Sequence, residues 1–264
     1  MKKNKIKDRR PPALKDEHMP KDFSIALKAY GGGGTTKSLN PNPKKLKYQS
    51  MKGFETEYKN IIDYIVRITY RIWEDKNIGY IYDTYSEDCR VWDEFGLQFG
   101  SEKIVADTVH TNNAFPDIRL FADEVIWAGD EKNSFHTSHR TIITGKNTGY
   151  SKFSPPTGKS VRLLCIANCV AKNNEIYYEN VVYDTVTLIK QLGLNVNEIA
   201  REIANQGNVG PFAPDFKSSK PKRKISKSKN LEFEIPNKIS NIRDFSKAVF
   251  NTIWNRRDFS AIDK

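Results

Sequence analysis

The stretch Glu179-Asn-Val-Val-Tyr-Asp184-Thr-Val-Thr-Leu-Ile-Lys-Gln-Leu-Gly193 decides how this chain is interpreted. Apolar side chains alternate as far as Tyr183, which predicts a strand, because successive side chains of a strand point to opposite faces. Residues 185–192 have helical spacing and end at Gly193, a residue type that is favoured just after a helix. The strand therefore delivers one carboxylate, that of Asp184, to its end.

Two roles are open for Asp184. A lone acid among aromatic residues can serve as a general base without a metal or another cofactor, so Asp184 is the candidate catalytic residue, and no cofactor or metal is expected. Aspartate directly before a helical run is also a standard helix N-cap, which is a purely structural role.

The elements upstream of this stretch predict an α+β fold. Residues 57–73 carry an apolar stripe at three- and four-residue spacing, and short helices are expected at 77–85 and 102–112. The strands predicted from alternating apolar residues are 90–92, 97–99, 119–128, 134–144, 161–170 and 176–183. Helices followed by a long antiparallel run of strands favour a curved sheet folded over the N-terminal helices.

The positive charge of the chain is confined to its tails. The 264 residues carry a net charge of +11, but residues 1–50 hold 13 Lys and Arg against 4 Asp and Glu, and residues 214–230 hold 7 against 1, so the remainder is mildly acidic. Such blocks bury too little apolar surface to fold. We expect a disordered segment over 1–50, including a flexible glycine hinge at 31–34, a folded domain over 51–205 and a flexible linker over 206–236. Nucleic-acid binding by the basic tails is the less favoured interpretation.

The C-terminus resembles an earlier part of the chain. Residues 244–262 align with residues 63–81 at a constant offset of 181, with the Asp, Ile-Trp and final Ile coincident. Self-similarity at a fixed offset indicates a duplicated module. Residues 237–264 are therefore predicted to begin a second, truncated repeat, although a generic amphipathic helix would give part of this match.

Several short motifs together resemble the SnoaL-like polyketide cyclase family of the nuclear-transport-factor-2-like superfamily. They are Ile72-Trp73, Gly96-Leu-Gln-Phe-Gly100, Ala114-Phe-Pro-Asp117, Ala122-Asp-Glu-Val-Ile, Pro156-Thr-Gly-Lys159 and the 179–193 stretch. The resemblance implies a cone-shaped sheet with an internal pocket for a small hydrophobic or polyketide-like ligand. It also implies a cofactor-independent aldol-type closure of a polyketide ester, with the strand-end aspartate, here Asp184, as acid and base.

The chain departs from the family pattern near the expected site. Asn180 stands where members often have tryptophan, and the strand before the aspartate strand carries Asn168 and no histidine. If Asp184 faces the pocket, Tyr178 and Asn180 share its face, because side chains alternate. The other candidate ligand-binding residues are Asn168, Trp73 and one of the neighbours His139 and Arg140.

The alternative function is a non-catalytic small-molecule-binding or dimerisation module of the same fold, which would form a homodimer. The N-terminus lacks an apolar core of signal-peptide length, and no segment approaches a membrane span. A cytoplasmic protein is therefore expected.

Overall fold

The computed structural model describes residues 11–206 and 239–263 of the chain. They belong to two compact units, divided after residue 218, and each unit is described by itself. The predicted linker lies outside the described residues, apart from Gln206 at its start. No helix in the described ranges is long and apolar enough to cross a bilayer.

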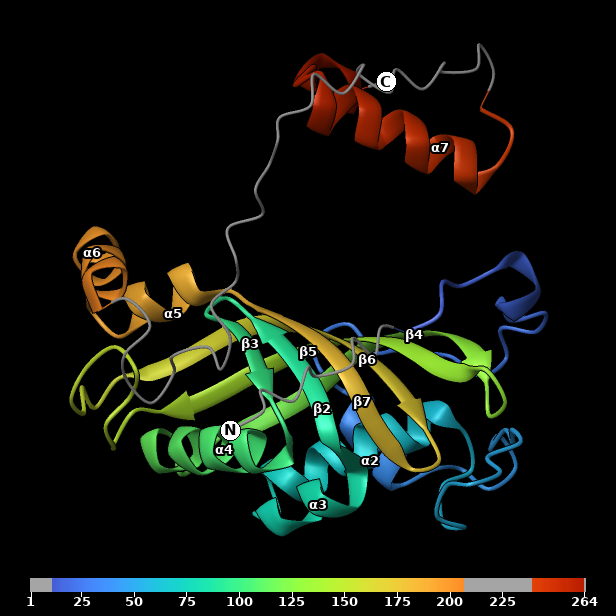
Figure 1. Ribbon diagram of the computed structural model, residues 1–264, viewed down its shortest axis with the longest axis horizontal. Coiled ribbons are helices and arrows are strands. Elements are labelled where there is room, and N and C mark those ends of the chain that lie inside the picture. Colours follow the sequence, from blue (N-terminus) through green and yellow to red (C-terminus); the bar gives the residue numbers. More distant parts are fainter. Residues whose placement is uncertain (1–10, 207–238, 264) are drawn as a thin grey trace, which may run out of the picture. The chain divides into compact units, whose positions relative to one another are not determined.

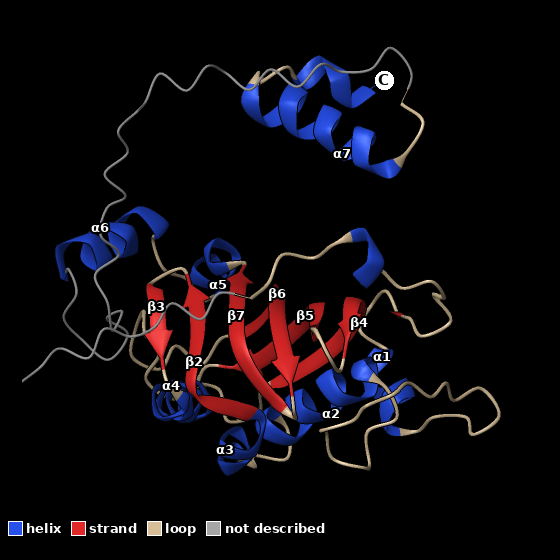
Figure 2. Cartoon of the chain, turned by 45° about the vertical axis from the view of Figure 1, so that its right-hand side comes forward, coloured by secondary structure: helices blue, strands red, loops and turns tan. Residues whose placement is uncertain are grey.

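A seven-stranded, mostly antiparallel sheet forms the larger unit (Figures 1 and 2). Its order is β1-β4-β5-β6-β7-β2-β3, and only β2 and β7 pair in parallel among these neighbours. The strands are β1 (Leu27–Lys28), β2 (Tyr85–Asp93), β3 (Gly96–Phe99), β4 (Arg119–Asp130), β5 (Ser134–Lys146), β6 (Ser160–Lys172) and β7 (Glu175–Tyr183). The predicted strands are confirmed, with extensions of a few residues.

The α-helices described in this unit are α1 (Gly34–Leu39), α2 (Ile61–Trp73), α3 (Ile81–Thr84), α4 (Ser101–Ala114), α5 (Thr185–Gln191) and α6 (Val196–Gln206), with a 3-10 turn at Ile78–Tyr80 between α2 and α3. The helices predicted at 57–73, 77–85, 102–112 and 185–192 are present, with shifts of a few residues, whereas α1 and α6 were not predicted. Helix α2 begins at Asn60, whose side chain accepts a hydrogen bond from the Asp63 amide at 2.9 Å. Such a cap satisfies an amide that has no partner within the helix.

Helices α2, α3 and α4 lie against one face of the sheet (Figure 2). The apolar stripe of α2 packs there with side chains of β5, β6 and β7, namely Phe135, Cys169 and Ile176. Amphipathic helices stabilise such a sheet because they bury its apolar face and their own stripe together. The predicted α+β architecture, a curved sheet over N-terminal helices, is confirmed.

The N-terminal segment differs from the expectation of disorder. Strand β1 pairs with β4 and forms one edge of the sheet, and the Ala29 amide donates to the Asp123 carbonyl at 2.7 Å. The expected glycine hinge is instead a close contact with β4, since a Cβ on Gly34 would lie 2.6 Å from the Ala122 carbonyl oxygen. Charge composition hid this docking, because the apolar residues that make it are few.

The smaller unit is helical where it is described. Helix α7 (Ile242–Val249) continues into a π-helical segment, Phe250–Asn255, and a 3-10 helix follows at Phe259–Asp263.

Candidate functional site

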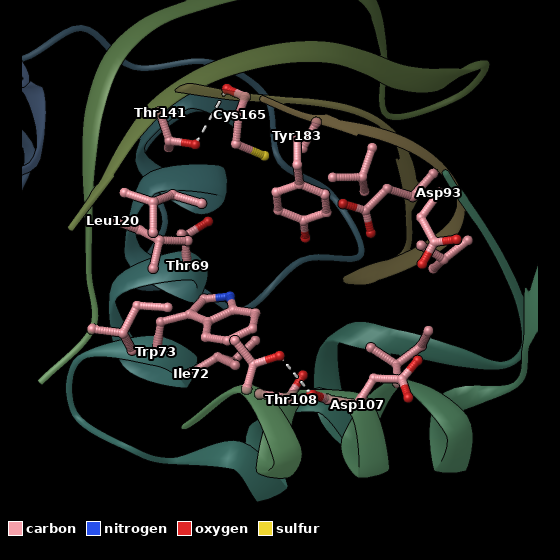
Figure 3. Close-up of a pocket in the computed structure, with 18 of the residues that line it drawn as sticks. Thr69, Ile72, Trp73, Asp93, Asp107, Thr108, Leu120, Thr141, Cys165 and Tyr183 are labelled. Atoms are coloured by element: carbon pink, nitrogen blue, oxygen red, sulfur yellow. Dashed lines mark hydrogen bonds between the residues drawn. The ribbon is translucent and has the colours of Figure 1, made fainter. Parts of the chain in front are cut away.

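A cavity of about 220 Å³ lies between the helix-covered face of the sheet and helices α2 and α4 (Figure 3). Its wall is mostly apolar. In Figure 3, Trp73 and Ile72 line it from the helix side, and Tyr183, Cys165 and Thr141 line it from the sheet. Concave apolar cavities with a few convergent polar groups are typical of small-molecule sites.

Glu179 is the buried carboxylate in this wall. Its side chain comes from the middle of β7 and is 7% exposed. The Tyr85 hydroxyl donates a hydrogen bond to Glu179 Oε2 at 3.0 Å. Burial raises the pKa of Glu179 to about 7, and the hydrogen bonds from Tyr85 and Cys169 oppose this rise only in part. A carboxyl with a pKa near neutrality can both accept and return a proton.

Tyr85 remains a proton donor at neutral pH. Burial, and next the negative charge of Glu179, raise the pKa of Tyr85 well above its ordinary value. The phenol therefore stays protonated and stabilises the ionised form of Glu179 through its hydrogen bond.

His139 faces the same cavity from β5. It is 3% exposed, and burial lowers the pKa of His139 to about 4, so that the imidazole is neutral at pH 7. No described residue gives its buried Nε2 a hydrogen-bond partner, and the same holds for Oε1 of Gln98, which also lines the cavity. Buried polar atoms are almost always hydrogen-bonded in folded proteins. Both side chains line the cavity, and each carries hydrogen-bonding capacity that the other described residues leave unused.

The sheet register fixes how these groups are spaced. Glu179 pairs with Cys169 on β6 and with Val91 on β2, and Val91 pairs with Gln98 on β3. His139 lies on β5 in the next row of cavity-facing residues along the strands. From strand spacing of about 4.8 Å and a rise of about 3.4 Å per residue, the Glu179 and His139 Cα atoms are about 12 Å apart. The two side chains can therefore contact different atoms of one small ligand.

Acidic side chains dominate the charged part of the lining. Asp93, Glu94 and Asp107 line the cavity in addition to Glu179, and Lys152 is the one lysine among the described residues that line it. Lys103 forms an ion pair with Asp107 at 2.5 Å. Burial lowers the pKa of Lys152. The charges disfavour an anionic ligand, because carboxylates and an anion repel each other in a poorly solvated site.

Asp184 lies outside the cavity lining. Its exposed carboxylate accepts a hydrogen bond from the Thr187 amide at 3.1 Å and caps α5. The hydrogen bonds from Thr187 lower the pKa of Asp184. Of the two roles left open by the sequence, the structure supports the N-cap.

The other predicted site residues divide between the two faces of the sheet. Trp73 and His139 line the cavity, whereas Tyr178, Asn180 and Asn168 do not. Asn168 and Asn180 pair across β6 and β7 in a row that alternates with the cavity-facing row. Arg140 instead pairs with Asp123, with Nε at 2.7 Å from Oδ2, beside the N-terminal segment. The alternative between His139 and Arg140 is therefore resolved in favour of His139.

The sequence-based prediction turned the wrong face of β7 toward the cavity. Its cavity-facing residues are Glu179, Val181 and Tyr183, and the register skips Tyr177, so that Ile176 faces the cavity as well. This bulge breaks strict alternation. A charged residue in a strand is normally exposed, which is why Glu179 was missed.

No protein-family model matches the sequence, and no curated protein matches it. Solved structures do match. A protein from Jannaschia sp. CCS1 assigned as a SnoaL-like polyketide cyclase has 16% identity, covering 56% of this chain and 99% of that chain, with a TM-score of 0.47. IdmH from Streptomyces antibioticus, assigned as a polyketide cyclase, has 17% identity, covering 50% and 97%, with a TM-score of 0.43.

A hypothetical protein from Catenulispora acidiphila with a ketosteroid isomerase-like fold has 17% identity, covering 50% of this chain and 95% of that chain, with a TM-score of 0.42. The kind of protein that the sequence resembles is thus also found among the matching structures. At these identities the likeness concerns the fold and not an activity.

Proposed function

We propose that this chain binds a small, neutral ring compound bearing a carbonyl group and moves a proton next to that carbonyl, in a cyclase- or isomerase-type reaction. The observation that carries the proposal is a buried carboxyl, Glu179, in the cavity wall with a pKa of about 7. Glu179 takes the acid–base role that the sequence had suggested for Asp184.

The size and charge of the cavity restrict the ligand. A cavity of about 150 Å³ accommodates a benzene ring. The cavity of about 220 Å³ therefore suits one ring or two fused rings better than a long polyketide chain. The carboxylates in the lining repel an anionic ligand, and the mostly apolar wall favours an uncharged one.

The proton transfer conserves all atoms. The Glu179 carboxylate removes a proton from the carbon beside the carbonyl, and the electron pair of the C–H bond moves into an enolate. In a cyclase, the enolate carbon attacks a second carbonyl of the same molecule, so that a C–C bond forms and that carbonyl becomes an alkoxide. The alkoxide then takes the proton back from Glu179. In an isomerase, the proton returns to another carbon of the conjugated enolate.

Tyr85 and His139 stabilise the negative charge that forms on Glu179 and on the ligand. The hydrogen bond from Tyr85 is strongest when Glu179 is ionised, so it favours the basic form before the transfer. A neutral imidazole can donate a hydrogen bond from Nε2 to the ligand carbonyl oxygen, where negative charge develops. His139 lines the cavity, and no described residue pairs with its Nε2.

The test uses 2-tetralone, a neutral two-ring ketone, as the probe. Exchange of its C1 protons for deuterium is followed by NMR at neutral pH with the unaltered chain, with Glu179→Gln and with Asp184→Asn. We expect acceleration by the unaltered chain and by Asp184→Asn, because asparagine is an equally good N-cap. Glu179→Gln should lower the protein-dependent rate about 100-fold or more.

Two results would overturn the catalytic proposal. One is equal exchange with and without Glu179, and the other is loss of exchange in Asp184→Asn alone. Saturable binding of 2-tetralone without any exchange would favour the non-catalytic binding module instead.

A further inference from the structure

The smaller unit repeats the start of helix α2 in atomic detail. Asn60 caps α2 by accepting from the Asp63 amide at 2.9 Å, and Asn241 caps α7 by accepting from the Asp244 amide at 2.9 Å. Both pairs are related by the offset of 181 residues seen in the sequence. The cap at Asn241 lies outside the segment whose residue identities first suggested the repeat, so it is an additional match.

The end of α2 also matches the end of the second helix, which is α7 together with its π-helical continuation to Asn255. The Asn77 amide donates to the Arg71 carbonyl at 3.0 Å, and the Asp258 amide donates to the Thr252 carbonyl at 3.0 Å. Donors and acceptors are again 181 residues apart. This bond spans six residues and so differs from the i to i−4 bond of a regular α-helix.

The turn after each helix uses the same rare backbone conformation. Lys76 and Arg257, at the same offset, both have φ of 59°. Positive φ is uncommon for residues other than glycine, and five such residues occur in the described chain. A 3-10 helix follows each turn, at Ile78–Tyr80 and at Phe259–Asp263. A generic amphipathic helix would not reproduce this turn.

The apolar stripe that α2 packs on the sheet is largely kept in the second helix. Ile61, Tyr64, Ile68 and Ile72 of α2 belong to the core cluster with β5, β6 and β7. Their counterparts are Ile242, Phe245, Val249 and Ile253, and Trp73 corresponds to Trp254. Ile242, Phe245 and Trp254 are 77%, 51% and 60% exposed. An apolar stripe of this extent on a short helix indicates an interaction surface.

The side of α2 that meets the N-terminal segment is not kept. Ile62 and Val66 pack there with Leu27, whereas their counterparts are Arg243 and Lys247. The second helix thus keeps the face that meets the sheet and has charges where α2 meets the N-terminal segment.

We infer that residues 241–263 are the opening helical element of a second copy of this fold, and that their apolar stripe binds the concave face of a second curved antiparallel sheet. The sheet of the first unit already holds α2, so the partner is a separate set of strands of the same kind. This inference is independent of the function proposed for the cavity.

The test is a graft within the full chain. Residues 67–78 are replaced by residues 248–259. Beneath the sheet this changes Ile68 to Val and Thr69 to Phe and leaves Ile72 and Trp73 as they are, and it also replaces Arg67 by Ala and Arg71 by Thr. The control takes residues 247–258, one position out of register, and so introduces Ile68→Ala, Ile72→Thr, Trp73→Ile and Ile78→Asp together with changes at exposed positions. Thermal unfolding of both variants is followed by circular dichroism.

We expect the in-register graft to unfold cooperatively at a temperature roughly 10 °C or more above the shifted graft, because the shifted graft leaves cavities beneath the sheet. If the in-register graft is unfolded, or melts no higher than the shifted graft, the second helix does not fit such a sheet and the inference is wrong.

Discussion

Replacing Glu179 by glutamine should change how the stability of the larger unit depends on pH. The pKa of Glu179 is raised from 4.5 to about 7 in the folded chain. A group whose pKa is raised by folding stabilises the protein fully below its unfolded pKa, and this contribution is lost as the pH rises through the folded pKa. The window for Glu179 therefore runs from about pH 4.5 to about pH 7.

The size of the effect follows from the shift. One pKa unit corresponds to about 1.4 kcal/mol, so this shift corresponds to about 3 kcal/mol of unfolding free energy. A glutamine side chain at this position would be neutral throughout and would still accept the hydrogen bond from Tyr85 through its amide oxygen. The free energy of unfolding of Glu179→Gln should rise relative to the unaltered chain by about 3 kcal/mol between pH 4.5 and pH 8.

The comparison must be a difference between two proteins, because His139 acts in the opposite direction. Its pKa falls from 6.5 to about 4 on burial, so its contribution is present above pH 6.5 and is lost as the pH falls towards 4. The two slopes largely cancel in the unaltered chain, so the Glu179 slope appears only in the difference between Glu179→Gln and the unaltered chain.

Urea denaturation at pH 5, 6, 7 and 8, followed by circular dichroism, gives the required free energies. Asp184→Asn is the matched control. The pKa of Asp184 is lowered, so its pH dependence lies in the acid range, and the variant should run parallel to the unaltered chain between pH 5 and 8. Parallel curves for Glu179→Gln and the unaltered chain would refute the assignment of a raised pKa to Glu179.

Three further changes have defined outcomes. His139→Asn should abolish the loss of stability that His139 causes as the pH falls from 6.5 to 4, which is about 3 kcal/mol by the same arithmetic. If the urea midpoint of the variant falls with pH as steeply as that of the unaltered chain, this prediction is wrong. Tyr85→Phe removes the hydrogen bond that lowers the Glu179 pKa, so the titration of the Glu179 carboxyl, followed by carbon NMR, should move to higher pH. A move to lower pH would contradict the role assigned to this hydrogen bond. Gly34→Ala places a Cβ 2.6 Å from the Ala122 carbonyl oxygen and should destabilise the docked N-terminal segment by about 1–3 kcal/mol. The variant should then be cleaved faster by a protease at sites before residue 40, and an unchanged cleavage rate would argue against the docking.

The elements between residues 57 and 192 were predictable from sequence because period-two and helical patterns depend on local residue order, whereas β1 and α1 were not predicted. Strands β4, β5 and β6 follow directly from alternating apolar residues. The orientation of β7 was not predictable. Val181 is 8% exposed and Val182 is 63% exposed, yet the sequence offers the two valines as equals. The bulge at Tyr177 and the helices that cover one face decide between them, and both depend on distant parts of the chain.

The site was predictable only in outline for the same reason. A pocket, Trp73 and one of His139 and Arg140 came from the sequence, but Glu179 acquires its pKa from burial against residues of other strands. The repeat between residues 60–81 and 241–262 was first indicated by the sequence, and the structure added the detail. Its residue identities were suggestive, while the shared cap, turn and backbone hydrogen bond become visible only in the folded chain.

The pH dependence of 2-tetralone proton exchange, measured with the unaltered chain, Glu179→Gln and Asp184→Asn, tests the central claim most directly. The rate should rise with a midpoint near pH 7 in the unaltered chain and in Asp184→Asn, and it should be lost in Glu179→Gln. A profile that Glu179→Gln leaves intact, or that Asp184→Asn abolishes, would contradict the role of Glu179 as the acid and base of this cavity.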